Sequence, residues 1–270
     1  MCRLAAYSGP PIPLERIVIA PRHSLLEQSQ SATEAKLAVN GDGFGIAWYG
    51  DDERPGLYRD VLPAWSDGNL PSICRLVKSH MFLAHVRAST TGETSRVNCH
   101  PFTYKNWSFA HNGQIGNFAL IRRQLEASLP DELYNIRRGT TDSELLFLLL
   151  LSNGLEVNPK RACERVITIL SQMQRNECEP TRLACVFSDG KSLFGFRNSS
   201  DQKSPTLYLS STLDAGGHAI ASEPLDGNGA QWTPLTENQF VTLSEGYFSQ
   251  EGLMIKQDYG INTNIAVAYA

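Results

Sequence analysis

With 270 residues, 41% of them hydrophobic, the chain can bury one large core or two modest ones. Its net charge of −4 lacks the basic excess of a nucleic-acid-binding surface, so nucleic acid is not expected as a partner. No stretch reaches the ~18 apolar residues of a membrane span, and the longest apolar run, LLFLLLL at 145–151, is typical of a buried helix.

The N-terminal stretch MCRLAAYSGPP has neither the basic start nor the hydrophobic segment of a signal peptide, which predicts a cytoplasmic protein without a membrane partner. The six cysteines form no CxxC pair and are expected to be free thiols; they are at positions 2, 74, 99, 163, 178 and 185. His80 and His85 are five residues apart in an expected strand and would face opposite ways, and no zinc-like spacing occurs. Neither a metal ion nor another cofactor is expected.

Alternating, β-branched and aromatic residues predict strands along much of the chain. In chain order they are 43–50, 81–88, 107–113, 182–189, 192–198, 206–211 and 218–223, with further strand patterns at 240–243 and 253–256. The spacing of apolar residues predicts helices over 114–129, 141–154 and 160–174.

The helix over 141–154 carries its own boundary signals. Thr141 and Glu144 form a capping-box arrangement at its start, and Gly154 is placed to end it. Strands, then helices, then strands again predict a single α+β domain over residues 1–270, with sheets packed together and helices outside.

The cysteine directly after the initial methionine allows two interpretations. In the first, Cys2, Leu4 and Ala6 form one face of a core strand, and Cys2 packs as a small apolar residue. In the second, removal of Met1 leaves Cys2 with both a thiol and a free α-amine. In reference peptides these groups titrate near pH ~8.5 and ~8, so the amine is suited to activate the thiol.

Two glycine-containing segments have ordinary structural explanations. NGDGFGIAWY (40–49) has no GxGxxG pattern and no following lysine, so it predicts a turn into a strand rather than a phosphate loop. In AHNGQIGNF (110–118), Asn112 and Gly113 alone are typical of a turn.

Two charged positions are also weak signals when taken singly. FLAHVRAST (82–90) ends a strand pattern at Arg87, which is typical of a surface cation. GTTDSELLF (139–147) places Asp142 in the first turn of a predicted helix, where the helix dipole favours any acid.

Together and in this order, the segments resemble the class II glutamine amidotransferases, whose glutaminase domains begin with a processed N-terminal cysteine. The matching segments are MCRL, NGDGFGIAWY, HVRAST, GETSRVNCHPF (92–102), HNGQIGNF and TTDSE, and ASEPL (221–225) is similar to a segment of short stand-alone members. The order Arg-Ala-Ser-Thr at 87–90 departs from the Arg-Trp-Ala-Thr of one family member, glucosamine-6-phosphate synthase. The synthase domain of the multidomain members has no counterpart in this sequence. The resemblance therefore implies a stand-alone glutaminase domain, built as a four-layer αββα N-terminal-nucleophile hydrolase sandwich of two antiparallel sheets.

The resemblance implies a catalytic set of Cys2, Asn112 and Gly113. The Cys2 sulfur would attack the glutamine side-chain amide to form a γ-glutamyl thioester, and its own α-amine would carry the proton. The Asn112 side chain and the Gly113 N–H would form the oxyanion hole. His100 also matches the family, and we interpret it as structural.

The implied substrate-binding set is Arg87, Thr90 and Asp142. Arg87 would grip the substrate α-carboxylate with two N–H bonds, Thr90 would add a hydroxyl contact, and Asp142 would accept the α-ammonium group. The five cysteines other than Cys2 would pack as small apolar groups.

Three functions remain open at this point. The first is a glutaminase that releases ammonia and glutamate, acting alone or delivering ammonia to a separate synthase subunit. The second is a γ-glutamyl hydrolase for a peptide or thiol conjugate, and the third is a non-catalytic binding protein that keeps the pocket. Each implies a small-molecule partner.

Overall fold

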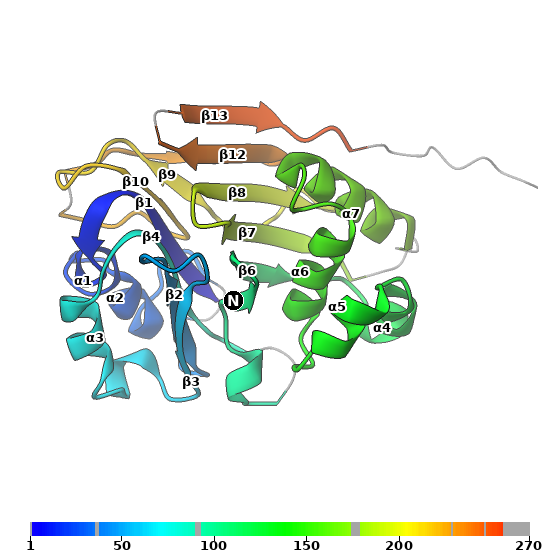
Figure 1. The fold of residues 1–270 in the computed structure, drawn as a ribbon, viewed down its shortest axis with the longest axis horizontal. Coiled ribbons are helices and arrows are strands. Elements are labelled where there is room, and N and C mark those ends of the chain that lie inside the picture. Colours follow the sequence, from blue (N-terminus) through cyan, green and yellow to red (C-terminus); the bar gives the residue numbers. More distant parts are fainter. Residues whose placement is uncertain are drawn as a thin grey trace, which may run out of the picture.

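The computed structural model describes residues 2–35, 38–89, 93–173, 179–227, 229–245 and 247–255. Within these ranges the strands form two antiparallel sheets that pack face to face (Figure 1). The first sheet has the order β11-β9-β10-β1-β4-β2-β3, with β1 Arg3–Pro13, β2 Phe44–Trp48, β3 Gly56–Asp60, β4 Lys78–Val86, β9 Tyr208–Ser210, β10 His218–Ala221 and β11 Trp232–Pro234. The second has the order β13-β12-β8-β7-β6-β5, with β5 Phe102–Tyr104, β6 Trp107–Gln114, β7 Arg182–Ser188, β8 Ser192–Ser199, β12 Gln239–Ser244 and β13 Tyr247–Gly252.

Helices cover the outer face of each sheet (Figure 1). On the first sheet lie α1 Glu15–Val18, α2 Leu25–Gln30 and α3 Leu70–Leu76; on the second lie α4 Phe118–Ala127, α5 Asp131–Ile136, α6 Asp142–Ser152 and α7 Pro159–Met173. In the connections that the structure describes, short 3-10 turns are formed by Ala64–Ser66 and Arg96–Asn98. A separate apolar cluster that includes Leu4, Ala110 and Val186 fills the space between the sheets. The four-layer αββα sandwich expected from the sequence is confirmed.

The helix α6 shows why this sequence folds here as it does. The Thr141 hydroxyl accepts a hydrogen bond from the Glu144 N–H at 3.2 Å, a cap that contributes about 1 kcal/mol. At the other end Gly154 has φ +95°, and its N–H and that of Leu155 bond back to Leu151 and Leu150. All residues from 143 to 151 are buried, as expected for a helix that is apolar on every side.

Some element boundaries differ from the sequence prediction. The helix predicted over 114–129 begins only at Phe118, because Asn117 adopts a left-handed conformation with φ 50°. Gln114 instead completes β6. The strand pattern at 253–256 is wrong: Leu253 follows the end of β13, and residue 256 lies outside the described residues.

The predictions for the cysteines and for membrane spans can be compared with the structure within the same described ranges. Cys74, Cys99, Cys163 and Cys185 are buried free thiols, as predicted, whereas Cys178 lies outside the described residues. No described helix combines the length and apolar character that a membrane span needs.

Candidate active site

Cys2 lies immediately before β1, which begins beside β6 near the middle of the molecule (Figure 1). In the β1–β4 ladder Arg3 is paired with Val86, so Cys2 is one register step further, beside Arg87. The Cys2 Sγ lies 3.6 Å from the carbonyl oxygen of Ala88, a contact in which the thiol donates. Burial raises the pKa of the Cys2 thiol, although the Ala88 contact and the nearby charge of Arg87 counteract this. The resting group is therefore a neutral thiol that needs a base before it can attack.

Arg87 is not the surface cation that its place at a strand end suggested, since it is only 3% exposed. Its Nη2 donates to the Ser89 hydroxyl at 3.0 Å and its Nη1 to the Asp42 carbonyl at 3.4 Å. The Asp42 carboxylate accepts the Ser89 N–H at 2.7 Å, which fixes this loop around the guanidinium. Within the described ranges no ion pair joins Arg87 to a carboxylate, so its buried charge is available to an anionic ligand.

Asn112 and Gly113 lie inside β6, where they pair with Ala184 and Leu183 of β7, so the turn expected from the dipeptide alone is wrong. Asn112 is completely buried, yet neither atom of its side-chain amide has a hydrogen-bond partner among the described residues. A buried amide normally has partners, and this unpartnered group is suited to a ligand. Gly113 has φ +151°, and a Cβ at this position would overlap the Arg182 carbonyl.

Asp142 is the first residue of α6, as predicted. Its Oδ2 accepts the Ile115 N–H at 2.8 Å, just after β6 ends, and its Oδ1 accepts the Ser143 hydroxyl at 3.2 Å. The carboxylate is thus fixed to the end of β6 while keeping acceptor capacity for a third partner.

Strand alternation shows which of these side chains share a layer. Leu4 and Ala110 belong to the cluster between the sheets, so Cys2 and Asn112, each two residues away, face the same layer. The His85 Nε2 lies 3.2 Å from the His111 carbonyl oxygen, which brings the end of β4 next to Asn112. The structure therefore gathers Cys2, Arg87 and Asn112 at one end of this layer. Thr90 lies outside the described residues.

The family model for class-II glutamine amidotransferases matches residues 24–210 of the chain. The chain belongs to this family. The matched range contains Arg87, Asn112, Gly113 and Asp142, and Cys2 precedes it.

Relatives and solved structures extend the match of this amidotransferase to nearly its whole length. The probable glutamine amidotransferase DUG3 of Saccharomyces cerevisiae is 33% identical over 293 residues, covering 91% of this chain and 82% of that protein. The γ-glutamyl-hercynylcysteine sulfoxide hydrolase of Mycobacterium tuberculosis is 32% identical over 250 residues, covering 91% and 94%. A glutamine aminotransferase class-II domain protein from Silicibacter pomeroyi superposes with a TM-score of 0.73 at 38% identity, covering 93% of this chain and 99% of that one.

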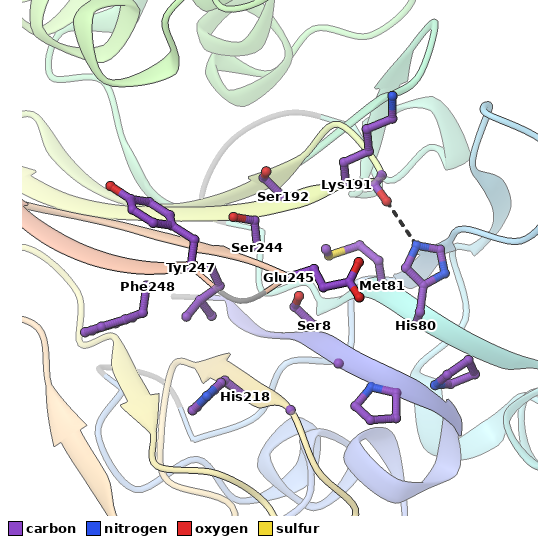
Figure 2. A pocket seen from close by; sticks show the side chains of 16 residues that line it. Ser8, His80, Met81, Lys191, Ser192, His218, Ser244, Glu245, Tyr247 and Phe248 are labelled. Atoms are coloured by element: carbon purple, nitrogen blue, oxygen red, sulfur yellow. Dashed lines mark hydrogen bonds between the residues drawn. The ribbon is translucent and has the colours of Figure 1, made fainter.

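A large hollow of the amidotransferase lies away from this site. A cavity of about 990 Å³ is lined by the far end of β1, by the β7–β8 turn and by the β12–β13 hairpin. Figure 2 shows Glu245 near the middle of the cavity lining, with His80 to one side of it and Tyr247 and Phe248 to the other. Ser8 of its wall is six residues from Cys2 along a strand, or about 20 Å. The site around Cys2 is therefore identified by its chemistry and register, not by cavity size.

Sequence reasoning gave the histidines no role beyond structure, and it missed that His85 and His100 stack beside the site while His111 contacts α6 from the other face of β6. His85 and His100 stack with ring centroids 4.1 Å apart, and the His111 Nδ1 lies 2.9 Å from the Ser143 hydroxyl. Burial lowers the pKa of all three, to about 3 for His85. They are neutral at neutral pH. The available signal in the sequence was that His111 directly precedes Asn112 and that His85 lies two residues before Arg87.

The described part of the amidotransferase contains no group of three His, Cys, Asp or Glu side chains that could hold a metal ion.

Proposed function

We propose that this class-II amidotransferase domain hydrolyses the side-chain amide of glutamine through a γ-glutamyl thioester on Cys2, releasing ammonia and glutamate. The observation that carries the proposal is the Asn112 amide, buried and without a partner, on the layer that Cys2 faces. Leaving such a group unsatisfied costs about 1–3 kcal/mol, which is explained if an oxyanion is its partner.

The first half-reaction needs Cys2 to be the mature N-terminus, after removal of Met1, which lies outside the described residues. The α-amine takes the thiol proton, and the sulfur bonds to the amide carbon. The Asn112 Nδ2–H and the Gly113 N–H then stabilise the carbonyl oxygen as it becomes negative. When the C–N bond breaks, the amine returns its proton to the departing ammonia.

In the second half-reaction a water molecule replaces the thiol. The α-amine accepts a water proton, the resulting hydroxide attacks the thioester, and the C–S bond breaks to give glutamate. The proton then returns to the thiolate, which restores the resting enzyme.

Substrate recognition depends on two opposite charges. Arg87 binds the α-carboxylate in a bidentate geometry that lysine cannot reproduce, and Thr90 contributes its hydroxyl. Asp142 accepts the α-ammonium group. A substrate bound at both ends places its side-chain amide beside Cys2, because Arg87 is adjacent to Cys2 in register.

Incubation of the processed protein with glutamine tests the proposal. Wild-type protein should release equimolar ammonia and glutamate, and Cys2→Ala should release neither. A glutamine-analogue diazoketone should label Cys2 alone among the cysteines, with Cys74→Ala as the control that labels normally. Activity retained in Cys2→Ala, or labelling at another thiol, would refute the mechanism.

A second substrate class is favoured by the relatives. The sulfoxide hydrolases of Mycobacterium tuberculosis and Mycolicibacterium smegmatis match over 94% and 97% of their lengths, and their names denote cleavage of a γ-glutamyl compound. The same residues would cleave a γ-glutamyl peptide or thiol conjugate, with an amine leaving in place of ammonia. The ratio of kcat/KM for glutamine and for γ-glutamyl dipeptides decides between them.

We place residues 1–270 in one glutaminase domain that works in the cytoplasm, where a free nucleophilic thiol stays reduced. Ammonia is either released or passed to a separate synthase subunit. Binding of glutamate without any hydrolysis would instead indicate a non-catalytic binding protein.

A further inference from the structure

A chain of hydrogen bonds runs behind the candidate oxyanion strand and joins β6 to the first turn of α6. The His111 Nδ1 lies 2.9 Å from the Ser143 Oγ, and the Ser143 Oγ lies 3.2 Å from the Asp142 Oδ1. His111 and Ser143 are buried, at 1% and 6% exposure. Neither residue has a part in the chemistry proposed above.

The direction of this chain follows from proton counting. The ionised carboxylate of Asp142 can only accept, so the Ser143 hydroxyl must donate its single proton to it. The Ser143 oxygen then accepts from His111, so the imidazole carries its proton on Nδ1. The His111 Nε2 is left as an acceptor, and it has no partner among the described residues. Burial is the largest effect on His111 and lowers its pKa, whereas the Asp142 charge and the Arg182 carbonyl, which lies near the Nε2 side of the ring, act to raise it.

The position of His111 makes this chain relevant to the site. His111 directly precedes Asn112, and alternation sends the two side chains to opposite faces of β6. Asn112 faces the layer between the sheets, and His111 faces α6. The Ile115 N–H, at the end of the same segment, binds the other oxygen of Asp142. Residues 111–115 therefore hold the Asp142 carboxylate from both sides.

We propose that His111 and Ser143 are positioning residues that fix the Asp142 carboxylate relative to Asn112 and Gly113. The strand β6, which carries the proposed oxyanion donors, would then also determine where the α-ammonium group of a ligand binds. The inference rests on the proposed role of Asp142 in the proposed function. The expected consequence is selective. Loss of the His111–Ser143–Asp142 contacts should weaken the binding of ligands that carry an α-ammonium group more than the binding of ligands that lack one.

Binding of the reaction product tests this without requiring turnover. Glutamate and glutarate differ only in the α-ammonium group, and calorimetry gives the ratio of their Kd values. In Ser143→Ala the preference for glutamate should fall about tenfold, the effect of one hydrogen bond to a charged group. In His111→Asn, whose amide N–H can replace the Nδ1–H, most of the preference should return relative to His111→Ala. Asp142→Asn gives the reference value for complete loss of the ammonium contact.

A matched control lies on the same helix. The Ser152 hydroxyl donates to the Leu149 carbonyl at 2.9 Å, at the far end of α6, so Ser152→Ala should keep the wild-type preference. An equal loss of affinity for both ligands in Ser143→Ala would indicate a merely structural role and overturn the inference. An unchanged preference, or wild-type protein that binds neither ligand, would overturn it as well. Glutamate binding with normal preference but no hydrolysis would refute only the proposed function.

Discussion

The Arg3 guanidinium and the Glu223 carboxylate form an ion pair inside the protein, with 3.5 Å between Nε and Oε1 and side chains that are 0% and 1% exposed. Glu223 also accepts hydrogen bonds from the Thr33 N–H and hydroxyl, from the Glu34 N–H and from the His23 ring. Burial acts to raise the pKa of Glu223, but these donors outweigh it and hold the pKa below its ordinary value. The buried carboxylate is thus charged and well satisfied.

This pair explains why ASEPL accompanies the N-terminal cysteine in the sequence. Arg3 follows Cys2 directly, and the β1–β10 register, with Ala5 opposite Ala221, puts Glu223 opposite Arg3. The Leu4 N–H also donates to the Ser222 hydroxyl at 3.0 Å. Residues 221–225 therefore hold the start of β1 in place. The Arg3–Glu223 pair lies on one face of the sheet, and the Cys2 side chain points to the other face, toward the site.

Glu223→Ala should destabilise the protein by about 3–5 kcal/mol, because it leaves the Arg3 charge buried without its partner. Urea unfolding followed by circular dichroism measures the loss. The matched control is Glu156→Ala, since the Glu156–Lys105 pair is 46% and 54% exposed and its removal should produce no measurable change. Equal unfolding midpoints for Glu223→Ala and wild type would contradict the assignment of a buried ion pair.

Asn112→Ala should separate activity from stability. Removal of one oxyanion donor lowers kcat by about 10²–10³, whereas the free protein loses no hydrogen bond because the Asn112 amide has no described partner. Steady-state kinetics with glutamine and urea unfolding on the same preparation give the two numbers. A variant that loses stability but turns over normally would show that Asn112 serves the fold and not the reaction.

Gly113→Ala should damage both properties. The backbone at φ +151° is costly for any residue with a Cβ, by about 1–3 kcal/mol, and the new methyl group would overlap the Arg182 carbonyl of β7. The strand must shift, and the oxyanion site shifts with it. Gly68→Ala is the control, because nothing lies within 4 Å of a Cβ at that position. We expect wild-type kcat and stability there, and similar behaviour of the two variants would be evidence against strain at Gly113.

These residues also show where sequence reasoning succeeds and where it stops. The boundaries of α6 could be predicted because Thr141, Glu144 and Gly154 act within one turn of the residues they cap. The Glu144 carboxylate nevertheless does not complete the capping box, since it accepts the N–H groups of Arg138 and Gly139 instead. A local sequence signal predicts the structure correctly where no other residue competes for the same hydrogen-bonding groups.

The missed features all depend on partners far along the chain. Asn112 and Gly113 are a strand and not a turn because β7, some 70 residues later, pairs with them. Arg87 is buried because the loop at Asp42 folds over it, and Ile115 is outside the helix because Asp142 binds its N–H. Periodicity within a short window contains none of this information.

The three buried histidines predict acid sensitivity above the range where carboxylates titrate. Their pKa values lie below the ordinary value of 6.5, through burial first, so the unfolded chain binds protons that the folded protein does not. Their contribution is complete above pH 6.5 and is lost as the pH falls toward the folded pKa, at up to about 1.4 kcal/mol per pH unit for each histidine. Urea midpoints at pH 7 and pH 5.5 should therefore differ clearly in wild type.

In His100→Phe, which keeps an aromatic ring against His85 and Phe102, the difference should shrink by about a third, because one of the three titrating groups is gone. His80→Gln is the control, since His80 is only partly buried and donates to the Gly190 carbonyl outside the cluster. An undiminished pH dependence in His100→Phe would mean that His100 takes up a proton in the folded protein as readily as in the unfolded chain.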